Sequence, residues 1–250
     1  MRTKKSQRSA LAVAALAAAS LALAACAPTD ASGGGSAGGE TSTSADPVDV
    51  GIIYSKTGPL AAYGEAYYEG FQAGLDYATD GTGEVDGRPV NVTFHDDGGD
   101  PDKAVGQAKD LIGKGYQILG GTVVSGVALK LAEQAEQNKV LYISGPAAVD
   151  ALTGINDYTF RSGRQSLQDV ATAGTFVDPD GAKVVVFAQD NAFGQGNLAA
   201  VEAVLGAQGA EVTSVLVPED ATEFTPFAHQ IVDAAPDLVF VAWAGATSGA

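Results

Sequence analysis

The chain has 250 residues, of which 46% are hydrophobic, and its 30 acidic and 14 basic residues give a formal net charge of −16. This charge excludes nucleic acid and anionic lipid surfaces as partners held by charge attraction. The single cysteine, Cys26, excludes an internal disulfide, so the folded part must be stabilised by an ordinary hydrophobic core.

The first 25 residues are arranged like an export signal. Four basic residues occur within the first eight positions, and an uncharged apolar run of about 16 residues, 10–25, follows them. This run is shorter than the roughly 20 residues that a membrane-spanning helix needs. The run ends in Leu23-Ala24-Ala25-Cys26, the pattern of a bacterial lipobox. We therefore expect residues 1–25 to be a lipoprotein signal peptide that is removed before Cys26, whose thiol then carries a lipid.

Residues 26–47 are expected to form the lipidated cysteine and a flexible linker. Residues 27–46 are almost entirely Ala, Gly, Ser, Thr and Pro, and none of them is aromatic. Such a composition cannot bury enough apolar surface to offset the entropy of ordering. Cleavage before Cys26 would remove four basic residues, which leaves 10 basic and 30 acidic ones and a net charge of −20. We expect an acidic, soluble domain on a tether, anchored by an N-terminal lipid to the outer face of the cell membrane.

From Val48 onward, short β-rich runs alternate with amphipathic stretches of helical length. Strands are predicted at residues 48–54, 90–95, 117–120, 140–143, 183–188, 211–217 and 238–243. Helices are predicted at residues 61–79, 101–114, 125–138, 166–177, 194–208 and 224–234. Several of the strands are almost wholly apolar, which is typical of parallel sheets covered on both faces. The alternation predicts right-handed βαβ units and a doubly wound, Rossmann-like α/β fold.

The alternation pauses between Asp150 and Ser166, where the chain is too irregular for a helix and too long for a simple turn. A second α/β series then begins, so we expect two lobes, residues 48–158 and 159–250, with a ligand cleft between them. Open parallel sheets bind ligands beyond the carboxyl ends of their strands, and two facing lobes would present two sets of such loops. Only three strands are predicted after the pause. The second lobe is therefore expected to be truncated and the chain to be the N-terminal part of a longer protein.

No set of residues points to catalysis, a metal site or a cofactor. Lys56-Thr57-Gly58 resembles part of the signature of penicillin-recognising enzymes, but no Ser-x-x-Lys sequence supplies a nucleophile. His95 and His229 are the only histidines, they are far apart, and the folded part has no thiol to join them at a zinc ion. The acidic turn at residues 96–101 lacks the spacing of a calcium loop and is better explained by Asp100 capping a helix. We expect a protein that is not an enzyme.

Small and polar residues at strand ends remain as candidates for binding. Ser125 follows a predicted strand and opens a predicted helix, so its hydroxyl either caps that helix or, with free backbone N–H groups, holds an anion. Residues 144–148 end the next strand with small side chains that would let a ligand approach the backbone. Tyr63, Phe193 and Trp243 fall in corresponding loops, where each can serve either the core or a ligand wall.

Motifs spread over residues 48 to about 249 carry a family resemblance. They are VGIIYSKTGPLAAYG at residues 50–64, EGF at 69–71, DD at 96–97 with DPDKA at 100–104, the segment 120–148, FR at 160–161, FGQG at 193–196 and Phe224. In their order and spacing these motifs resemble the leucine/isoleucine/valine-binding proteins, which have the type I periplasmic-binding fold. The resemblance implies two lobes that close on a solute by a hinge motion.

The resemblance also implies roles for individual residues. Ser125 corresponds to the serine that holds the ligand carboxylate, and Ala147 to the position whose backbone carbonyl binds the ligand ammonium. Ala148 is the neighbour of that position, and Tyr63 corresponds to an aromatic residue of the first-lobe wall. The family's acidic partner for the ammonium is expected beyond Ala250.

Three further positions bear on the expected ligand. Phe193 stands where the family commonly has a tyrosine and Val149 where it commonly has a threonine, so both positions lack the usual hydroxyl. Trp243 ends the last predicted strand and is expected to line the cleft. These departures broaden the expected ligand from a branched-chain amino acid to a small solute with a carboxylate, and leave the solute itself open.

The resemblance thus implies an extracytoplasmic solute-binding lipoprotein that delivers an amino acid or a similar solute to the transmembrane subunits of an ABC permease. The lipobox favours this function. A ligand-sensing receptor of the same fold, which regulates a signalling or amide-utilisation system without transport, is the alternative. A lipid-anchored hydrolase lacks a nucleophile–base pair among these residues.

Overall fold

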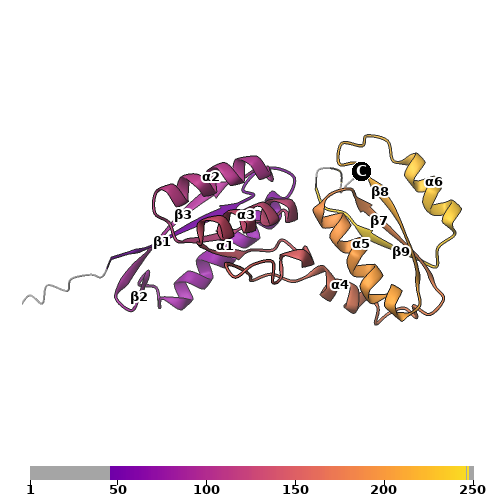
Figure 1. Cartoon of the computed structure of the whole chain (residues 1–250), viewed down its shortest axis with the longest axis horizontal. Helices are drawn as coiled ribbons and strands as arrows, with labels where there is room; N and C mark the ends of the chain where they lie inside the picture. Colours follow the sequence, from indigo (N-terminus) through magenta and orange to yellow (C-terminus); the bar gives the residue numbers. More distant parts are fainter. Residues whose placement is uncertain (1–45, 246, 248–250) are drawn as a thin grey trace, which may run out of the picture. The chain divides into compact units, whose positions relative to one another are not determined.

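The computed structural model of the chain describes residues 46–245 and residue 247. The predicted signal peptide, Cys26 and nearly all of the predicted linker lie outside the described residues. Among the helices described, none is both long enough and apolar enough to cross a membrane. The described residues build two separate sheets (Figure 1).

The first sheet has six strands in the order β2-β3-β1-β4-β5-β6. Its elements, in chain order, are β1 (Val48–Tyr54), α1 (Ala61–Ala78), β2 (Glu84–Val85), β3 (Arg88–Asp96), α2 (Pro101–Gly113), β4 (Ile118–Gly121), α3 (Ser125–Asn138), β5 (Leu141–Ser144), the 3-10 helix η1 (Asp150–Leu152) and β6 (Thr159–Arg161). All its neighbouring strands are parallel except β2 and β3. The carboxyl ends of β1, β3, β4 and β5 therefore meet at one edge of this sheet.

The core of the first sheet lies between the sheet and helices α2 and α3. Ile53, Leu119 and Tyr142 come from β1, β4 and β5, and their side chains are completely buried in this core. Helix α1 covers part of the opposite face, where Phe71 packs edge-on against Phe94 of β3 with ring centroids 5.9 Å apart. Alternate residues of the apolar strands are thus buried on opposite faces, as a doubly wound sheet requires.

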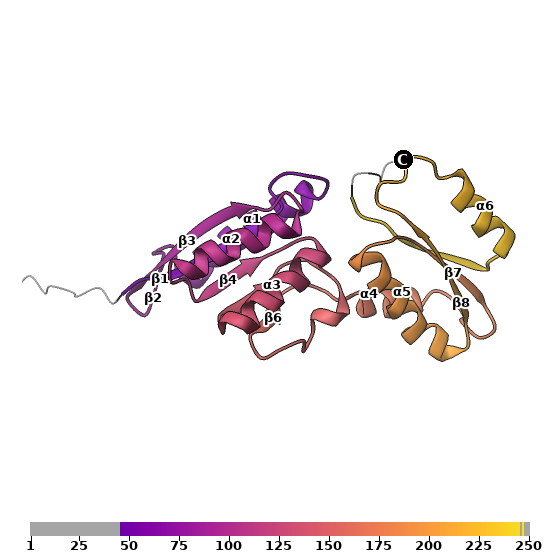
Figure 2. The same ribbon diagram turned by 45° about the horizontal axis from the view of Figure 1, so that its top comes forward.

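The second sheet has the order β8-β7-β9, and its strands are parallel. The elements of this region are α4 (Ser166–Ala173), β7 (Lys183–Gln189), α5 (Ala192–Val204), the 3-10 helix η2 (Gly206–Gln208), β8 (Glu211–Val217), α6 (Thr225–Ala234) and β9 (Leu238–Ala242). Val186 and Val201 belong to a second core between α5 and the sheet. Helix α4 lies beside α5 (Figure 2), and α6 lies on the other side of the sheet (Figure 1). Both sheets confirm the predicted α/β class.

Two strands of the first sheet are absent from the predicted set. β2 pairs with β3 through a tight turn at Asp86 and Gly87, whose φ angles are 51° and 74°. Positive φ at both positions is the hairpin geometry that Asp-Gly favours. β6 falls in the stretch expected to be irregular and pairs with β5, so the first sheet extends to Arg161, past the boundary expected after residue 158. Strands of two and three residues are too short to show a periodic pattern.

Two helices differ from their predicted limits by more than one residue. α4 ends at Ala173 instead of residue 177, because Gly174 follows it and glycine disfavours helix. α5 begins at Ala192 instead of residue 194, because the Asn191 side chain accepts hydrogen bonds from the N–H groups of Phe193 and Gly194 at 3.0 and 2.9 Å. This N-cap starts the helix close to the end of β7.

Candidate functional site

A cavity of about 680 Å³, called the cleft below, lies at the carboxyl ends of strands from both sheets. Its walls come from the segments that follow β1, β3, β4 and β5 in the first sheet, and from those at the ends of β7, β8 and β9 in the second. Its volume falls within the roughly 300–1,000 Å³ of sites that bind small molecules. The position agrees with the rule that parallel sheets bind ligands beyond their carboxyl ends.

Ser125 lines the cleft at the start of α3 and is 3% exposed. The N-cap position of α3 is held by Val124, and no side chain makes a capping hydrogen bond there. The geometry therefore excludes the capping role that the sequence left open for Ser125. The serine instead stands on the cleft wall at the positive end of a 14-residue helix, where a carboxylate is favoured.

Three aromatic residues expected on the ligand wall line the cleft. Tyr63 lies in the first turn of α1 and is 58% exposed, whereas Phe193, in the first turn of α5, is half-buried. The ring of Trp243, which follows β9, packs against Phe187 and Phe224 with centroids 4.8 and 5.8 Å apart. Both sheets thus contribute ring surface to the cleft.

Ala148 lines the cleft, but Ala147 and Val149 are not among its lining residues. Their side chains, 1% and 4% exposed, are buried in the core of the first sheet. Their carbonyl oxygens accept hydrogen bonds from the Arg161 guanidinium, at 2.8 Å for Ala147 and 3.0 Å for Val149. The Ala147 carbonyl, expected to face a ligand ammonium, therefore faces Arg161, and Val149 packs inward.

The cleft also contains polar residues that were not predicted from the sequence. Gln189 ends β7, is 3% exposed, and accepts a hydrogen bond from the N–H of Ala244 at 3.2 Å. Asn191, besides capping α5, donates a hydrogen bond to Glu219 at 2.7 Å. A polar residue that ends an apolar strand, and an Asn before a helix, are signals that could have identified Gln189 and Asn191.

The charged residues of the cleft lining already have partners. Arg164 forms an ion pair with Asp169 across 2.9 Å, and Glu219 accepts the hydrogen bond from Asn191. Neither contact was expected from the sequence, because Arg164 and Asp169 are five residues apart, outside the i,i+3 and i,i+4 spacings of helix pairs, and Asn191 and Glu219 are 28 residues apart. A solute in the cleft would therefore meet helix dipoles, amides and rings in addition to these paired charges.

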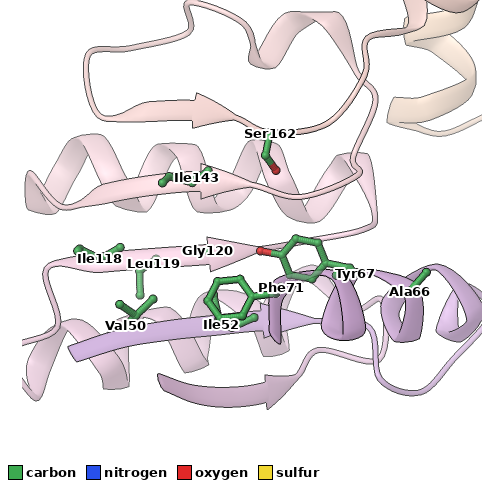
Figure 3. A pocket seen from close by; sticks show the side chains of 11 residues that line it. Val50, Ile52, Ala66, Tyr67, Phe71, Ile118, Leu119, Gly120, Ile143 and Ser162 are labelled. Carbon is green, nitrogen blue, oxygen red and sulfur yellow. The ribbon is translucent and has the colours of Figure 1, made fainter. Parts of the chain in front are cut away.

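A second cavity, of about 430 Å³, lies on the face of the first sheet that carries α1 (Figure 3). Its apolar lining includes Val50, Ile52, Phe71, Ile118 and Ile143. The Tyr67 hydroxyl points toward Gly120 (Figure 3), and burial raises the pKa of Tyr67 to about 12. No charged side chain lines this cavity. The cleft, which combines rings with polar groups and a helix N-terminus, is therefore the candidate site.

The acidic turn after β3 is held by hydrogen bonds. Asp100 caps α2, as predicted, by accepting from the N–H groups of Asp102 and Lys103 at 2.8 and 3.2 Å. Asp96 accepts from the N–H and hydroxyl of Thr57 at 3.0 and 2.6 Å. Burial acts to raise the pKa of Asp96, but these bonds and nearby Lys103 outweigh it and lower the pKa to about 2.

Across residues 46–245 no group of three or more His, Cys, Asp or Glu side chains could hold a metal ion.

The family profile described as "Periplasmic binding protein" matches residues 47–250, which is most of the chain. The chain belongs to the periplasmic binding protein family. This membership confirms the family resemblance carried by the sequence motifs. It also agrees with the two α/β sheets and the cleft at their strand ends.

Among curated proteins, this periplasmic binding protein is similar to the Leu/Ile/Val-binding protein BraC3 of Rhizobium johnstonii, with 28% identity over 197 residues. It is also similar to the Leu/Ile/Val-binding protein homolog 3 of Brucella melitensis, with 26% identity over 197 residues. Each alignment covers 77% of this chain and 53% of the relative. The chain spans about half the length of the curated relatives it matches.

Solved structures of similar proteins support the type I fold. An ABC-type branched-chain amino acid transporter protein of Rhodopseudomonas palustris is 36% identical, with a TM-score of 0.61 over 81% of this chain and 57% of that chain. A solute-binding protein of an ABC transporter from the same species, in complex with 4-hydroxybenzoate, is 25% identical, with a TM-score of 0.67 over 78% of this chain and 54% of that chain. Both are described as proteins of ABC transport.

Proposed function

We propose that this periplasmic binding protein is an extracytoplasmic solute-binding lipoprotein. It delivers an amino acid or a similar small, carboxylate-bearing solute to the transmembrane subunits of an ABC import permease, and it catalyses no reaction. The observation that carries the proposal is the cleft of about 680 Å³, whose walls are strand-end loops of two α/β sheets. The relatives named for Leu/Ile/Val binding and for ABC transport support it.

Ser125 and the first N–H groups of α3 hold the carboxylate of the solute in this proposal. A helix N-terminus carries about half a positive charge, and a carboxylate there gains charge-assisted hydrogen bonds. Tyr63, Phe193 and Trp243 flank the apolar part of the solute from both sheets. This combination suits branched or aromatic carboxylic acids, with or without an amino group.

The predicted lipid on Cys26 gives the proposal its location. A lipid-anchored binding protein is held near the permease that it serves, and the predicted linker of residues 26–47 gives it reach. Metabolic labelling with a radioactive fatty acid tests this part. We expect label in the wild-type protein and none in Cys26→Ser, and label in both would show that the lipid lies elsewhere.

Trp243 provides a binding assay, because it lines the cleft and its fluorescence should change when a solute binds there. The complete protein is titrated with L-leucine, L-isoleucine, L-valine, L-phenylalanine and 4-hydroxybenzoate while tryptophan fluorescence and thermal unfolding are recorded. A binder at 100 times its Kd should stabilise the protein by about 2.7 kcal/mol. If neither these compounds nor a wider panel of small carboxylic acids changes fluorescence or unfolding, the proposed function is wrong.

Ser125→Ala tests the carboxylate site itself. Losing a hydrogen bond to a charged group costs about 1–3 kcal/mol, so affinity for the tightest binder of the panel should fall by roughly 5- to 150-fold. Thr79→Ala is the control, because Thr79 also carries a buried hydroxyl group but lies at the carboxyl end of α1 and does not line the cleft. Equal affinities of the two variants, measured by calorimetry, would refute the role of Ser125.

A further inference from the structure

Asp97 is a completely buried carboxyl group just beyond the carboxyl end of β3. Its Oδ1 atom accepts hydrogen bonds from the Ser55 hydroxyl and from the Gly99 N–H, both at 2.7 Å. Its Oδ2 atom has no hydrogen-bond partner in the described part of the chain. Burying a carboxyl group with one bare oxygen costs free energy. Stability alone therefore does not account for an acidic residue at this position.

The hydrogen bond from Ser55 connects Asp97 to the part of α1 that carries Tyr63. A Cβ atom on Gly64 would lie 1.9 Å from the carbonyl oxygen of Ser55, so the first turn of α1 rests directly on the backbone of Ser55. Tyr63 precedes Gly64 in that turn and lines the cleft. A displacement of Ser55 must therefore displace Tyr63.

The hydrogen bond from Gly99 connects Asp97 to the start of α3, where Ser125 lies. Gly99 lines the cleft, and a Cβ atom on it would lie 3.5 Å from a methyl group of Val124. Val124 directly precedes Ser125 at the start of α3, and both residues line the cleft. The loop that contains Gly99 therefore supports the start of α3 from one side.

We propose that Asp97 is a positioning residue of the binding site. Its carboxyl group joins the segment before α1 to the segment before α2, and through them it sets the distance between the Tyr63 wall and the Ser125 wall. Asp97 itself does not line the cleft, so it acts through these neighbours. The inference rests on the proposed binding function of the cleft and adds to it a residue that preorganises the site before a solute arrives.

The test compares Asp97→Ala, Asp97→Asn and Thr79→Ala in the complete protein, against the tightest binder of the panel named above. Asp97→Ala should weaken binding by about tenfold or more, because it releases both segments. Asp97→Asn should bind within about threefold of wild type, since an amide oxygen can accept both hydrogen bonds. Because Asn also fills the same space as Asp, Asp97→Leu separates the two roles: leucine has a similar volume but accepts neither hydrogen bond, so it should weaken binding as Asp97→Ala does.

Thr79→Ala is the matched control. Thr79 is also buried, and its hydroxyl also joins two segments, donating to the Leu75 carbonyl at 2.8 Å and accepting from the Gly83 N–H at 3.2 Å, but it does not line the cleft. Its loss should lower the Tm and leave Kd unchanged. If Asp97→Ala changes Kd no more than Thr79→Ala does, the proposal is overturned. Should Asp97→Ala fail to fold, Ser55→Ala removes one of the two bonds and should weaken binding by about threefold or more.

Hydrogen exchange without any solute provides an independent measurement. Asp97→Ala should speed exchange at the amides of Tyr63, Gly64 and Ala128, which donate hydrogen bonds at the starts of α1 and α3, whereas Thr79→Ala should not. If wild type binds no member of the panel, the proposed function fails while this exchange result still decides the role of Asp97. If exchange at these amides is the same in Asp97→Ala as in wild type, the inference is overturned, whatever affinity is measured.

Discussion

The packing that supports the cleft can be tested at Gly64, where alanine adds a single methyl group. A Cβ atom there would lie 1.9 Å from the carbonyl oxygen and 2.7 Å from the carbonyl carbon of Ser55. Real contacts of this kind stay beyond about 3 Å, so α1 or the backbone at Ser55 would have to move by about 1 Å. Overpacking costs about 1–3 kcal/mol, and the upper end applies where backbone must shift. We expect Gly64→Ala to lower the free energy of unfolding by about 3 kcal/mol.

Gly70 is the matched control on the same helix. Apart from its own stretch of α1, a Cβ atom at Gly70 meets no atom within 4 Å, so the helix propensity of alanine decides the effect there. Gly70→Ala should raise the free energy of unfolding by about 0.5–1 kcal/mol. The changes in the free energy of unfolding at these two positions of α1 should therefore have opposite signs and differ by about 4 kcal/mol.

Urea unfolding followed by circular dichroism at 222 nm measures both variants. This signal reports on the helices that pack on both sheets, whereas the fluorescence of Trp243 would report on the surroundings of the second sheet. If Gly64→Ala proves as stable as Gly70→Ala, α1 does not rest on Ser55, and the reasoning about the first wall of the cleft is refuted.

Three further predictions concern other contacts. The lowered pKa of Asp96, about 2 against 3.8, means that its stabilisation is present above about pH 4 and is lost as the pH falls toward 2. Asp96→Asn should cost roughly 1 kcal/mol at pH 7 after solvent screening and almost nothing below pH 2; a pH-independent cost in urea unfolding would contradict this. Arg161→Lys should lower the free energy of unfolding by about 2–3 kcal/mol, because a lysine cannot reach the Ala147 and Val149 carbonyls together; an unchanged Tm would refute it. Phe224→Ala should move Trp243 emission to longer wavelength, since its ring packs on the indole; an unshifted spectrum would show that the ring does not shield Trp243.

Much of the fold could be predicted from the sequence, because its signals are local. Runs such as residues 184–188 are apolar and rich in β-branched valine, and Asp100 with Pro101 marks the start of a helix. The strands β2 and β6 were missed because they have two and three residues and are held by their neighbours. In such short segments tertiary pairing, and not local preference, decides the conformation.

The candidate site could be predicted in part, for a reason of topology. Ser125, Tyr63 and Trp243 were selected as residues near strand ends, and parallel strands bring their carboxyl ends to one edge. Ala147 and Val149 are adjacent to Ala148 in sequence, yet their side chains pack into the core while their carbonyls bind Arg161. The direction of each peptide group after a strand depends on contacts with distant residues, so sequence spacing could not predict it.

By itself the sequence determined the α/β class, the order of nearly all the elements and the family motifs, because each of these depends on residues that are close together along the chain. Only the tertiary structure decided which residues share the cleft, that Ser125 does not cap α3, and that Asp97 is buried between two loops. Hydrogen bonds and close contacts between residues about 40 positions apart, such as Ser55 and Asp97, form only when the sheet places two strand ends side by side.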